Sequence, residues 1–153
     1  MGKLSPDIGP VVIVAQIDVE SGFKADKSGP RGEEGISQLP PDVFARLGKD
    51  DDDNGKTSAL DAADSILAQG RFMCELVDRV SPFATLGKPL KDALSLALSA
   101  YDAGPDTVRE VKGVPRTGES RQYALSVRSQ SAKYLGGMPP RPQRANQTED
   151  TEQ

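Results

Sequence analysis

The chain has 153 residues, a length that suits one domain with its own core, and a formal net charge of −4. It contains no histidine, which excludes Ser-His-Asp and Cys-His triads and disfavours a zinc site, so any catalysis must rest on carboxylates, Tyr, Lys or Ser. No long basic stripe and no apolar stretch of membrane-spanning length occur, so neither nucleic acid binding nor membrane insertion is expected.

Hydrophobic periodicity, together with proline and glycine positions, predicts an all-α domain with little or no β structure. The first helix is expected from about Ile8 to Ser21, with Pro10 tolerated in its first turn. A short second helix should follow Pro40 and end at Gly48. The remaining helices are predicted over about residues 60–80, from Pro89 to the stop at Gly104, over 105–111 and over 119–134.

Two of these helices carry an apolar stripe that should face the core. In the helix over 60–80, one face is expected to hold Ala63, Ile66, Leu67, Gly70, Cys74 and Val77. In the helix that follows Pro89, the stripe consists of Leu90, Ala93, Leu94, Ala97, Leu98 and Tyr101. Cys74, the single cysteine, is therefore interpreted as a small buried hydrophobe rather than a nucleophile, and it excludes an internal disulfide.

The two ends of the chain differ from its middle. From Gly136 onward the sequence loses its periodicity and nearly all apolar content, which predicts a disordered tail or linker over residues 136–153 after a domain of residues 1–135. The first ten residues, MGKLSPDIGP, lack the separate apolar region and cleavage site of a signal peptide.

Glu20 ends a nearly continuous apolar run that begins at Val11, and Ser21 and Gly22 follow it at once. Because burial and the negative end of the helix dipole both disfavour a carboxylate, this placement predicts a raised pKa for Glu20. A carboxylic acid that keeps its proton near neutral pH is a candidate general acid, the group that cleavage of a glycosidic bond needs. The alternative is a solvated Glu that simply ends a core helix.

Four short motifs stand in order along the chain. They are ESGF at 20–23, GISQ at 35–38, AYDAGP at 100–105 and ESRQY at 119–123. In this order and spacing they resemble the motifs of the soluble lytic transglycosylases, bacterial cell-wall enzymes with a lysozyme-like fold. The resemblance covers about Ile8 to Leu135 and implies a helical domain with a cleft.

The resemblance also implies a reaction. Glu20 would protonate the oxygen of the β-1,4 bond between N-acetylmuramic acid and N-acetylglucosamine, and would then act as base toward the muramyl 6-hydroxyl, leaving a 1,6-anhydromuramyl end. Ser21 would hold the Glu20 side chain or a substrate group, and Gln38 would bind sugar or peptide amides. Tyr101 and Tyr123 would line the subsite around the acid. Peptidoglycan strands would be the partner, and catalysis would require no cofactor.

Asp102 departs from the family pattern, in which Asn is usual at this position. An ionised Asp can only accept hydrogen bonds, and a second carboxylate near Glu20 would raise the pKa of one of the pair. Asp102 could instead activate a water and give a hydrolase, as in a goose-type lysozyme, or be a tolerated replacement at a helix end. A catalytically silent peptidoglycan-binding or virion structural module is a third reading.

The acidic loop after the second helix is a candidate calcium site. Its sequence follows the pattern D-x-D-x-N-G-x5-D, in which Gly55 supplies the turn and Asp replaces the final Glu of the calcium-loop template. A solvated acidic turn between helices is the alternative. The expected ligands of a structural Ca²⁺ are Asp50, Asp52, Asn54, the carbonyl of Lys56, and Asp61.

Localisation follows from the implied substrate. Because peptidoglycan lies outside the cytoplasmic membrane, an extracellular or cell-wall-associated protein is expected, acting as a monomer. With no export signal in this sequence, it would be a domain of a larger secreted protein or a phage product.

Overall fold

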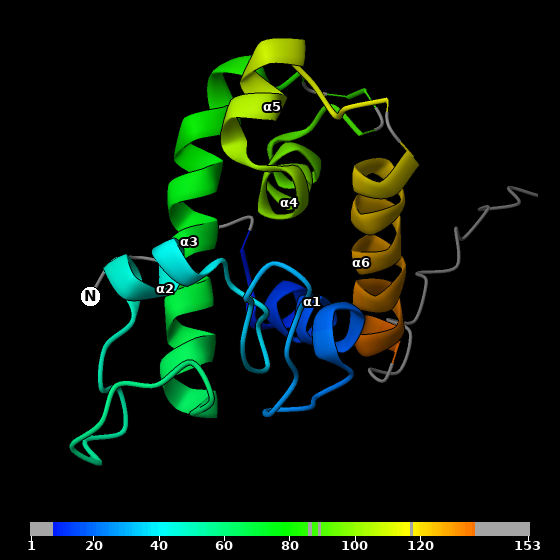
Figure 1. Cartoon of the computed structure of the whole chain (residues 1–153). Helices are drawn as coiled ribbons and strands as arrows, with labels where there is room; N and C mark the ends of the chain where they lie inside the picture. The colour runs from blue at the N-terminus through cyan, green and yellow to red at the C-terminus, as the bar shows by residue number, and fades with distance from the viewer. Residues whose placement is uncertain (1–7, 86, 89, 117, 137–153) are drawn as a thin grey trace, which may run out of the picture.

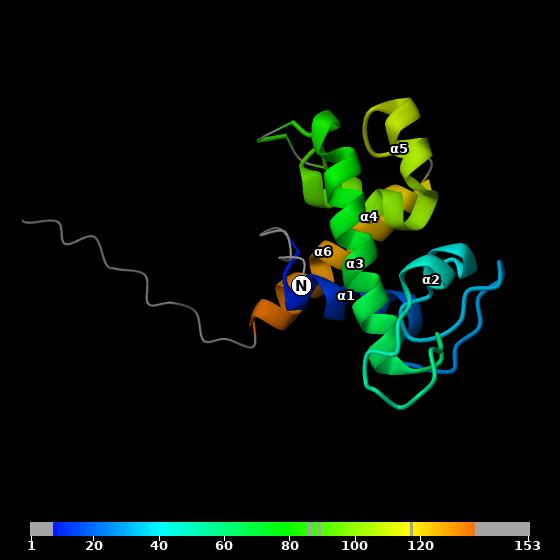
Figure 2. The same cartoon turned by 90° about the vertical axis from the view of Figure 1, so that its left-hand side faces the viewer.

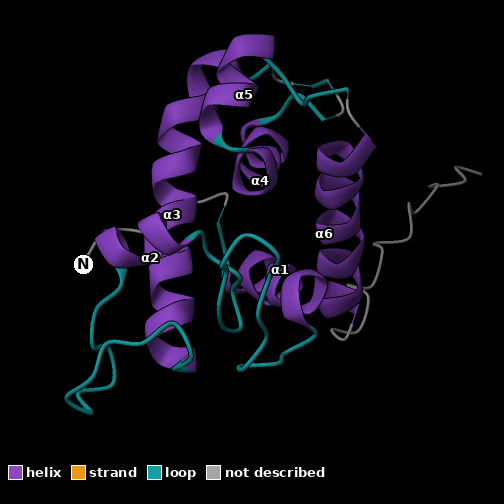
Figure 3. Cartoon of the chain, in the orientation of Figure 1, coloured by secondary structure: helices purple, strands orange, loops and turns teal. Residues whose placement is uncertain are grey.

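The structure is a computed structural model that describes residues 8–85, 87–88, 90–116 and 118–136 (Figure 1). These residues form helices and loops, with no strand among them beyond two isolated β-bridges that join Ser28 to Glu34 and Glu34 to Leu39 (Figure 3). The predicted all-α fold is confirmed. The helices are α1 (Pro10–Ser21), α2 (Pro41–Leu47), α3 (Ala62–Val80), η1 (Ser81–Phe83), α4 (Ala93–Ala103), α5 (Pro105–Val111) and α6 (Gly118–Gly136).

Proline and glycine set the bounds of α1. Pro10 opens the helix, where a missing N–H costs nothing, and Gly22 ends it in the left-handed conformation, with its N–H donating to the Asp18 carbonyl. Six of the twelve residues of α1 are buried, because the helix packs against α6 and α3 (Figure 1). Glu20 therefore sits in the last turn of a core helix, as the sequence predicts.

The inward face of α3 differs from the predicted one. Leu67 is 48 % exposed and Cys74 is only partly buried, whereas the polar side chains of Asp64, Ser65 and Gln69 are fully buried. The apolar pattern was misleading because these polar residues lie on the inward face, where Asp64 and Gln69 form hydrogen bonds. The apolar members of this face are Ala68, Phe72, Met73, Leu76, Val77 and Val80.

Helix α4 is the centre of the fold. It packs against α3, α5 and α6, and Figure 1 shows it nearly end-on between them. Residues 95–101 are buried without interruption, so the helix is enclosed all round rather than along one stripe. It starts at Ala93, later than the predicted Pro89, because Leu90 takes a φ of +59° that no helix continues.

The loop from Gly22 to Leu39 folds over the end of α1. Gly35 makes this possible: its φ is +90°, and a Cβ there would lie 1.8 Å from the Ala59 carbonyl oxygen. Its N–H donates to the Lys27 carbonyl at 2.9 Å. Only glycine allows this approach, which brings the loop against the acidic segment ahead of α3.

Two further predictions concern the ends and the membrane. The predicted tail lies outside the described residues except for Gly136, which ends α6, so the domain boundary stays a prediction. Within the described part of the chain, no helix is long and apolar enough to cross a membrane.

Candidate active site

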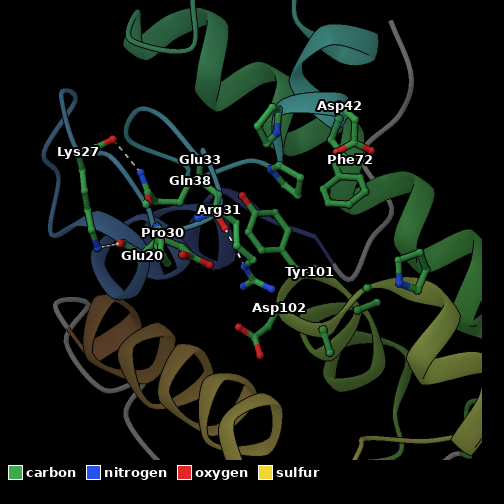
Figure 4. A pocket seen from close by; sticks show the side chains of 18 of the residues that line it. Glu20, Lys27, Pro30, Arg31, Glu33, Gln38, Asp42, Phe72, Tyr101 and Asp102 are labelled. Carbon is green, nitrogen blue, oxygen red and sulfur yellow. Dashed lines mark hydrogen bonds and ion pairs between the residues drawn. The ribbon is translucent and has the colours of Figure 1, made fainter.

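A cavity of about 590 Å³ opens beside the end of α1 (Figure 4). Its walls come from the last turn of α1, the loop over 27–38, the start of α2, Phe72 of α3, and the α4–α5 junction over 100–105. Three of the four motifs thus meet at one cavity, although as many as 80 residues separate them in sequence.

Glu20 lines this cavity and is partly buried. Burial raises the pKa of Glu20 from 4.5 to about 7, and a hydrogen bond from Tyr123 opposes that rise. The charge of Asp102 raises it further, the charge of Lys27 lowers it, and that of Glu33 raises it. The raised pKa predicted from the helix is confirmed, with desolvation as its largest cause.

Tyr101 forms a wall of the cavity and holds the loop. Its hydroxyl donates to the Ser37 carbonyl at 2.5 Å, and only 6 % of the residue is exposed. Its ring centroid lies 5.5 Å from that of Phe72 and 6.3 Å from that of Tyr123, to which it is nearly parallel. Burial, with the nearby Glu20 charge, raises the pKa of Tyr101 well above 10, so the hydroxyl remains a donor.

Tyr123 is not among the residues that line the cavity, contrary to its expected place, and instead connects Glu20 to a buried polar chain. Gln16 donates from Nε2 to the Tyr123 hydroxyl at 3.2 Å, and Gln69 donates from Nε2 to Gln16 Oε1 at 3.0 Å. Because the Tyr123 oxygen accepts from Gln16, its own proton is free for Glu20. Burial and the Glu20 charge keep the pKa of Tyr123 well above 10.

Gln16 and Gln69 were not predicted as parts of the site. The available signal was Gln16 itself, a polar residue within the largely apolar run, one helical turn before Glu20. Both amides are fully buried, and Gln69 Oε1 has no hydrogen-bond partner among the described residues.

Ser21 and Gln38 hold the backbone in place. The Ser21 hydroxyl is buried and donates to the Ile36 carbonyl at 2.7 Å, so it ties α1 to the GISQ segment and does not face the cavity, contrary to its expected role. Gln38 does line the cavity, but its amide nitrogen is engaged by the carbonyls of Lys27 at 3.0 Å and Gly35 at 2.9 Å.

Asp102 reaches the same cavity as Glu20, which sequence alone could not settle. It stands in the last turn of α4 and accepts a hydrogen bond from the Ser120 hydroxyl at 3.0 Å. Two carboxyl groups from different motifs therefore face one cleft (Figure 4).

The loop between the first two motifs contributes charged residues that sequence reasoning did not assign to the site. Lys27 donates from Nζ to the Glu20 backbone carbonyl, and Arg31 pairs with Glu33 at 3.3 Å. Both cations and Glu33 line the cavity, as does Asp42 at the start of α2. The position of this loop between ESGF and GISQ was the only signal available.

The acidic loop lies apart from the cavity, around a compact cluster of carboxylates. Asp50, Asp52 and Asp64 each place one carboxylate oxygen within 4.8 Å of the others, a donor set that fits a hard divalent cation. Asp64, which was not predicted, is fully buried. Gly55 makes the predicted turn at a φ of +83°.

The other predicted calcium ligands make contacts within the loop. Asp61 caps α3 by accepting from the N–H groups of Ala63 and Asp64. The Asn54 amide donates to Asp61 at 3.0 Å and to Asp52 at 3.1 Å. The N–H of Lys56 donates to Asn54 Oδ1 at 2.8 Å.

The comparisons with known proteins agree with this architecture. The 70 kDa soluble lytic transglycosylase of Escherichia coli has a similar structure, with a TM-score of 0.64 and 21 % sequence identity over 86 % of this chain. The match spans 22 % of that longer protein, and at this identity it shows the fold. Residues 2–124 match the family described as the transglycosylase SLT domain. The chain belongs to this transglycosylase family.

Proposed function

We propose that the protein is a lytic transglycosylase that cleaves the β-1,4 bond between N-acetylmuramic acid and N-acetylglucosamine in peptidoglycan. The observation that carries this proposal is the position of Glu20 in the lining of the cleft, where the pKa of its carboxyl group is raised to about 7. A group with this pKa is populated in both protonation states near neutral pH, as an acid that later acts as a base must be.

The reaction has two proton transfers. Glu20 donates its proton to the glycosidic oxygen as the bond to the anomeric carbon breaks. The Glu20 carboxylate then accepts the proton of the muramyl 6-hydroxyl, whose oxygen bonds to the anomeric carbon and closes the 1,6-anhydro ring. Glu20 ends protonated, and no water is consumed.

Two neighbours of Glu20 support these steps. The hydrogen bond from Tyr123 stabilises the carboxylate formed after the first transfer. The Asp102 carboxylate places negative charge in the cleft, where the anomeric carbon develops positive charge. Tyr101 and Gln38 shape the cleft, and Ser21 is a positioning residue in this proposal.

Glu20→Gln tests the proposal on purified peptidoglycan. Loss of the general acid should lower the turnover rate by roughly 10²–10⁴-fold. Glu34→Gln, an exposed change in the neighbouring loop, serves as the matched control. Equal activity of Glu20→Gln and the parent protein would contradict an enzymatic role for this cleft, and would favour a silent binding module.

Hydrolysis, as in a goose-type lysozyme, is the second candidate function, and Asp102 in the same cavity is the observation that favours it. A carboxylate opposite the acid can activate a water. Mass spectrometry of the products separates the outcomes, because an anhydro end is lighter than a reducing end by one water. Reducing ends that disappear in Asp102→Asn would establish the hydrolase.

We further propose that the protein acts as a monomer at the cell wall or outside the cell, within a larger secreted or phage protein. The substrate class supports the location, and the similar E. coli protein is itself much longer than the matched region.

We also propose a structural Ca²⁺ at the acidic loop, held by Asp50, Asp52 and Asp64, where it would neutralise three converging carboxylates. Ca²⁺ should then raise the melting temperature, and Asp52→Asn should abolish the rise. Asp53→Asn is the matched control, because Asp53 is exposed, lies outside the cluster and has a φ of +57° that Asn tolerates. An unchanged melting temperature in the parent protein would contradict the site.

A further inference from the structure

A second cavity, of about 580 Å³, lies at the other end of α4 and shares no lining residue with the cleft. Leu90 and Lys91 precede α4, the segment 111–116 connects α5 to α6, and Arg121 projects from the first turn of α6. At α4 the two cavities lie at opposite ends of the helix, but at α6 they are neighbours, because Ser120, next to Arg121, donates to Asp102 of the cleft at 3.0 Å. Figure 2 shows the loop ahead of α4 and the α1–α2 loop on opposite sides of the molecule.

The charge of this second cavity is opposite to that of the protein. The chain has a formal net charge of −4, yet the residues that line the cavity include four cations and no carboxylate. The cations are Lys91, Lys112, Arg116 and Arg121. A concentration of positive charge against the overall sign indicates a site for an anion rather than a general surface property.

The arginines of the cavity are also distinguished by what they lack. Among the residues that the structure describes, every other arginine pairs with a carboxylate within 4.0 Å. Arg116 and Arg121 have no such partner in the described part of the chain. Their guanidinium groups are therefore free to bind a carboxylate or phosphate from outside the protein.

Apolar side chains line the rest of the cavity. Leu90, Val111, Val114 and Pro115 stand between the cations. Backbone hydrogen bonds hold these segments in place: Gly113 N–H donates to the Val108 carbonyl at 3.2 Å, and Thr85 N–H donates to the Lys91 carbonyl at 2.7 Å. A ligand that fits must offer alkyl groups as well as negative charge, which a phosphate polymer does not.

We propose that this basic pocket binds an acidic peptide, with carboxylates on Arg116 and Arg121 and alkyl groups against Val111 and Val114. We identify the peptide as a peptidoglycan stem peptide, which carries several carboxylates and alanine methyl groups. This identification rests on the proposed function. The pocket lies outside the cleft proposed to hold the cleaved bond, since the two cavities share no lining residue.

Titration of a fluorescent synthetic stem pentapeptide tests the proposal, because a peptide without glycan gives the cleft no bond to cleave. The Arg116→Gln, Arg121→Gln double variant should bind it roughly tenfold more weakly than the parent protein. Amidation of the peptide carboxylates should weaken binding to the parent by a similar factor. The Arg46→Gln, Arg79→Gln double variant is the matched control, since it removes two exposed arginines outside both cavities and should bind like the parent.

Three results would overturn the pocket: no binding of the peptide by the parent protein, equal loss of affinity in both double variants, or tighter binding of polyphosphate than of the peptide. The glycan reaction is measured separately, on strands stripped of peptides, where the Arg116→Gln, Arg121→Gln variant should turn over as the parent does. Peptide binding without glycan cleavage would contradict the proposed function and leave the pocket standing.

Discussion

At the residue scale, the chemistry depends on a balance at one carboxyl group. Burial and Asp102 raise the pKa of Glu20, while the hydrogen bond from Tyr123 and the charge of Lys27 lower it. No single neighbour sets the Glu20 pKa of about 7. Each neighbour can therefore be substituted in turn, and the direction in which the pKa shifts can be predicted.

The pH dependence of kcat/KM should reveal two of these contributions with opposite signs. The proposed reaction needs protonated Glu20, so activity should fall as the pH rises through about 7. Asp102→Asn removes a charge that raises the pKa, so its activity should fall at a lower pH than in the parent. Tyr123→Phe removes a hydrogen bond that lowers it, so its activity should fall at a higher pH. Shifts in the same direction would contradict this account.

Stability should also depend on the protonation of Glu20. Folded Glu20 has a raised pKa, so the folded state binds the proton more tightly than the unfolded chain, and stability falls as the pH rises from about 4.5 to 7. Glu20→Gln should therefore be more stable than the parent at pH 8, by an amount of the order of 1–3 kcal/mol. The gap should vanish near pH 4, as measured by urea unfolding, and a gap that persists there would point to a cause other than ionisation.

At the element scale, proline and glycine made the ends of the helices predictable. The burial of polar side chains could not be predicted from the sequence. Helix α1 begins at Pro10 and ends before Gly22, close to the predicted ends, and α5 begins at Pro105. The inward face of α3 was wrong because periodicity counts apolar residues and cannot detect that Gln69 finds a partner in Gln16 from another helix. Tertiary hydrogen bonds of this kind have no local sequence pattern.

The Gln16–Gln69 pair yields a test of this coupling between α1 and α3. Gln16→Leu should destabilise the protein by about 1–3 kcal/mol, because it leaves the buried Gln69 amide short of a partner. Adding Gln69→Leu should recover part of the loss, since it also removes an oxygen with no partner among the described residues. Urea unfolding of the two single variants and the double variant forms the cycle, and strictly additive losses would count against the pairing.

At the scale of the whole molecule, the motifs predicted which residues gather at the cleft but not how they are held. Glu20, Gln38, Tyr101 and Asp102 all line it, as their motifs predict. Ser21 donates to the Ile36 carbonyl instead of lining the cleft. The cations of the loop over 27–38 were not predicted, because loop conformation depends on contacts with distant segments. Asp64, in the first turn of α3, was missed as a member of the carboxylate cluster for the same reason.

Gly35, where the cleft loop meets the acidic loop, offers a test of this assembly. Gly35→Ala should lower the melting temperature severely and reduce activity, because its Cβ would overlap the Ala59 carbonyl. Gly55→Ala is the matched control: its φ of +83° carries similar backbone strain, yet no atom lies within 4 Å of its Cβ, so only about 1–2 kcal/mol should be lost. Equal losses in the two variants would assign the effect to strain alone.

Gln16 and Tyr123 are 107 residues apart in the sequence. This separation determines the order in which the two sides of the site become available during synthesis. A nascent chain exposes Glu20 early, but Tyr123 and the helix that covers α1 emerge much later. Until α6 docks, the acid is solvated and ionised near neutral pH, so the unfinished protein lacks the protonated group on which cleavage depends. The proposed glycan-cleaving activity is therefore acquired only when α6 docks.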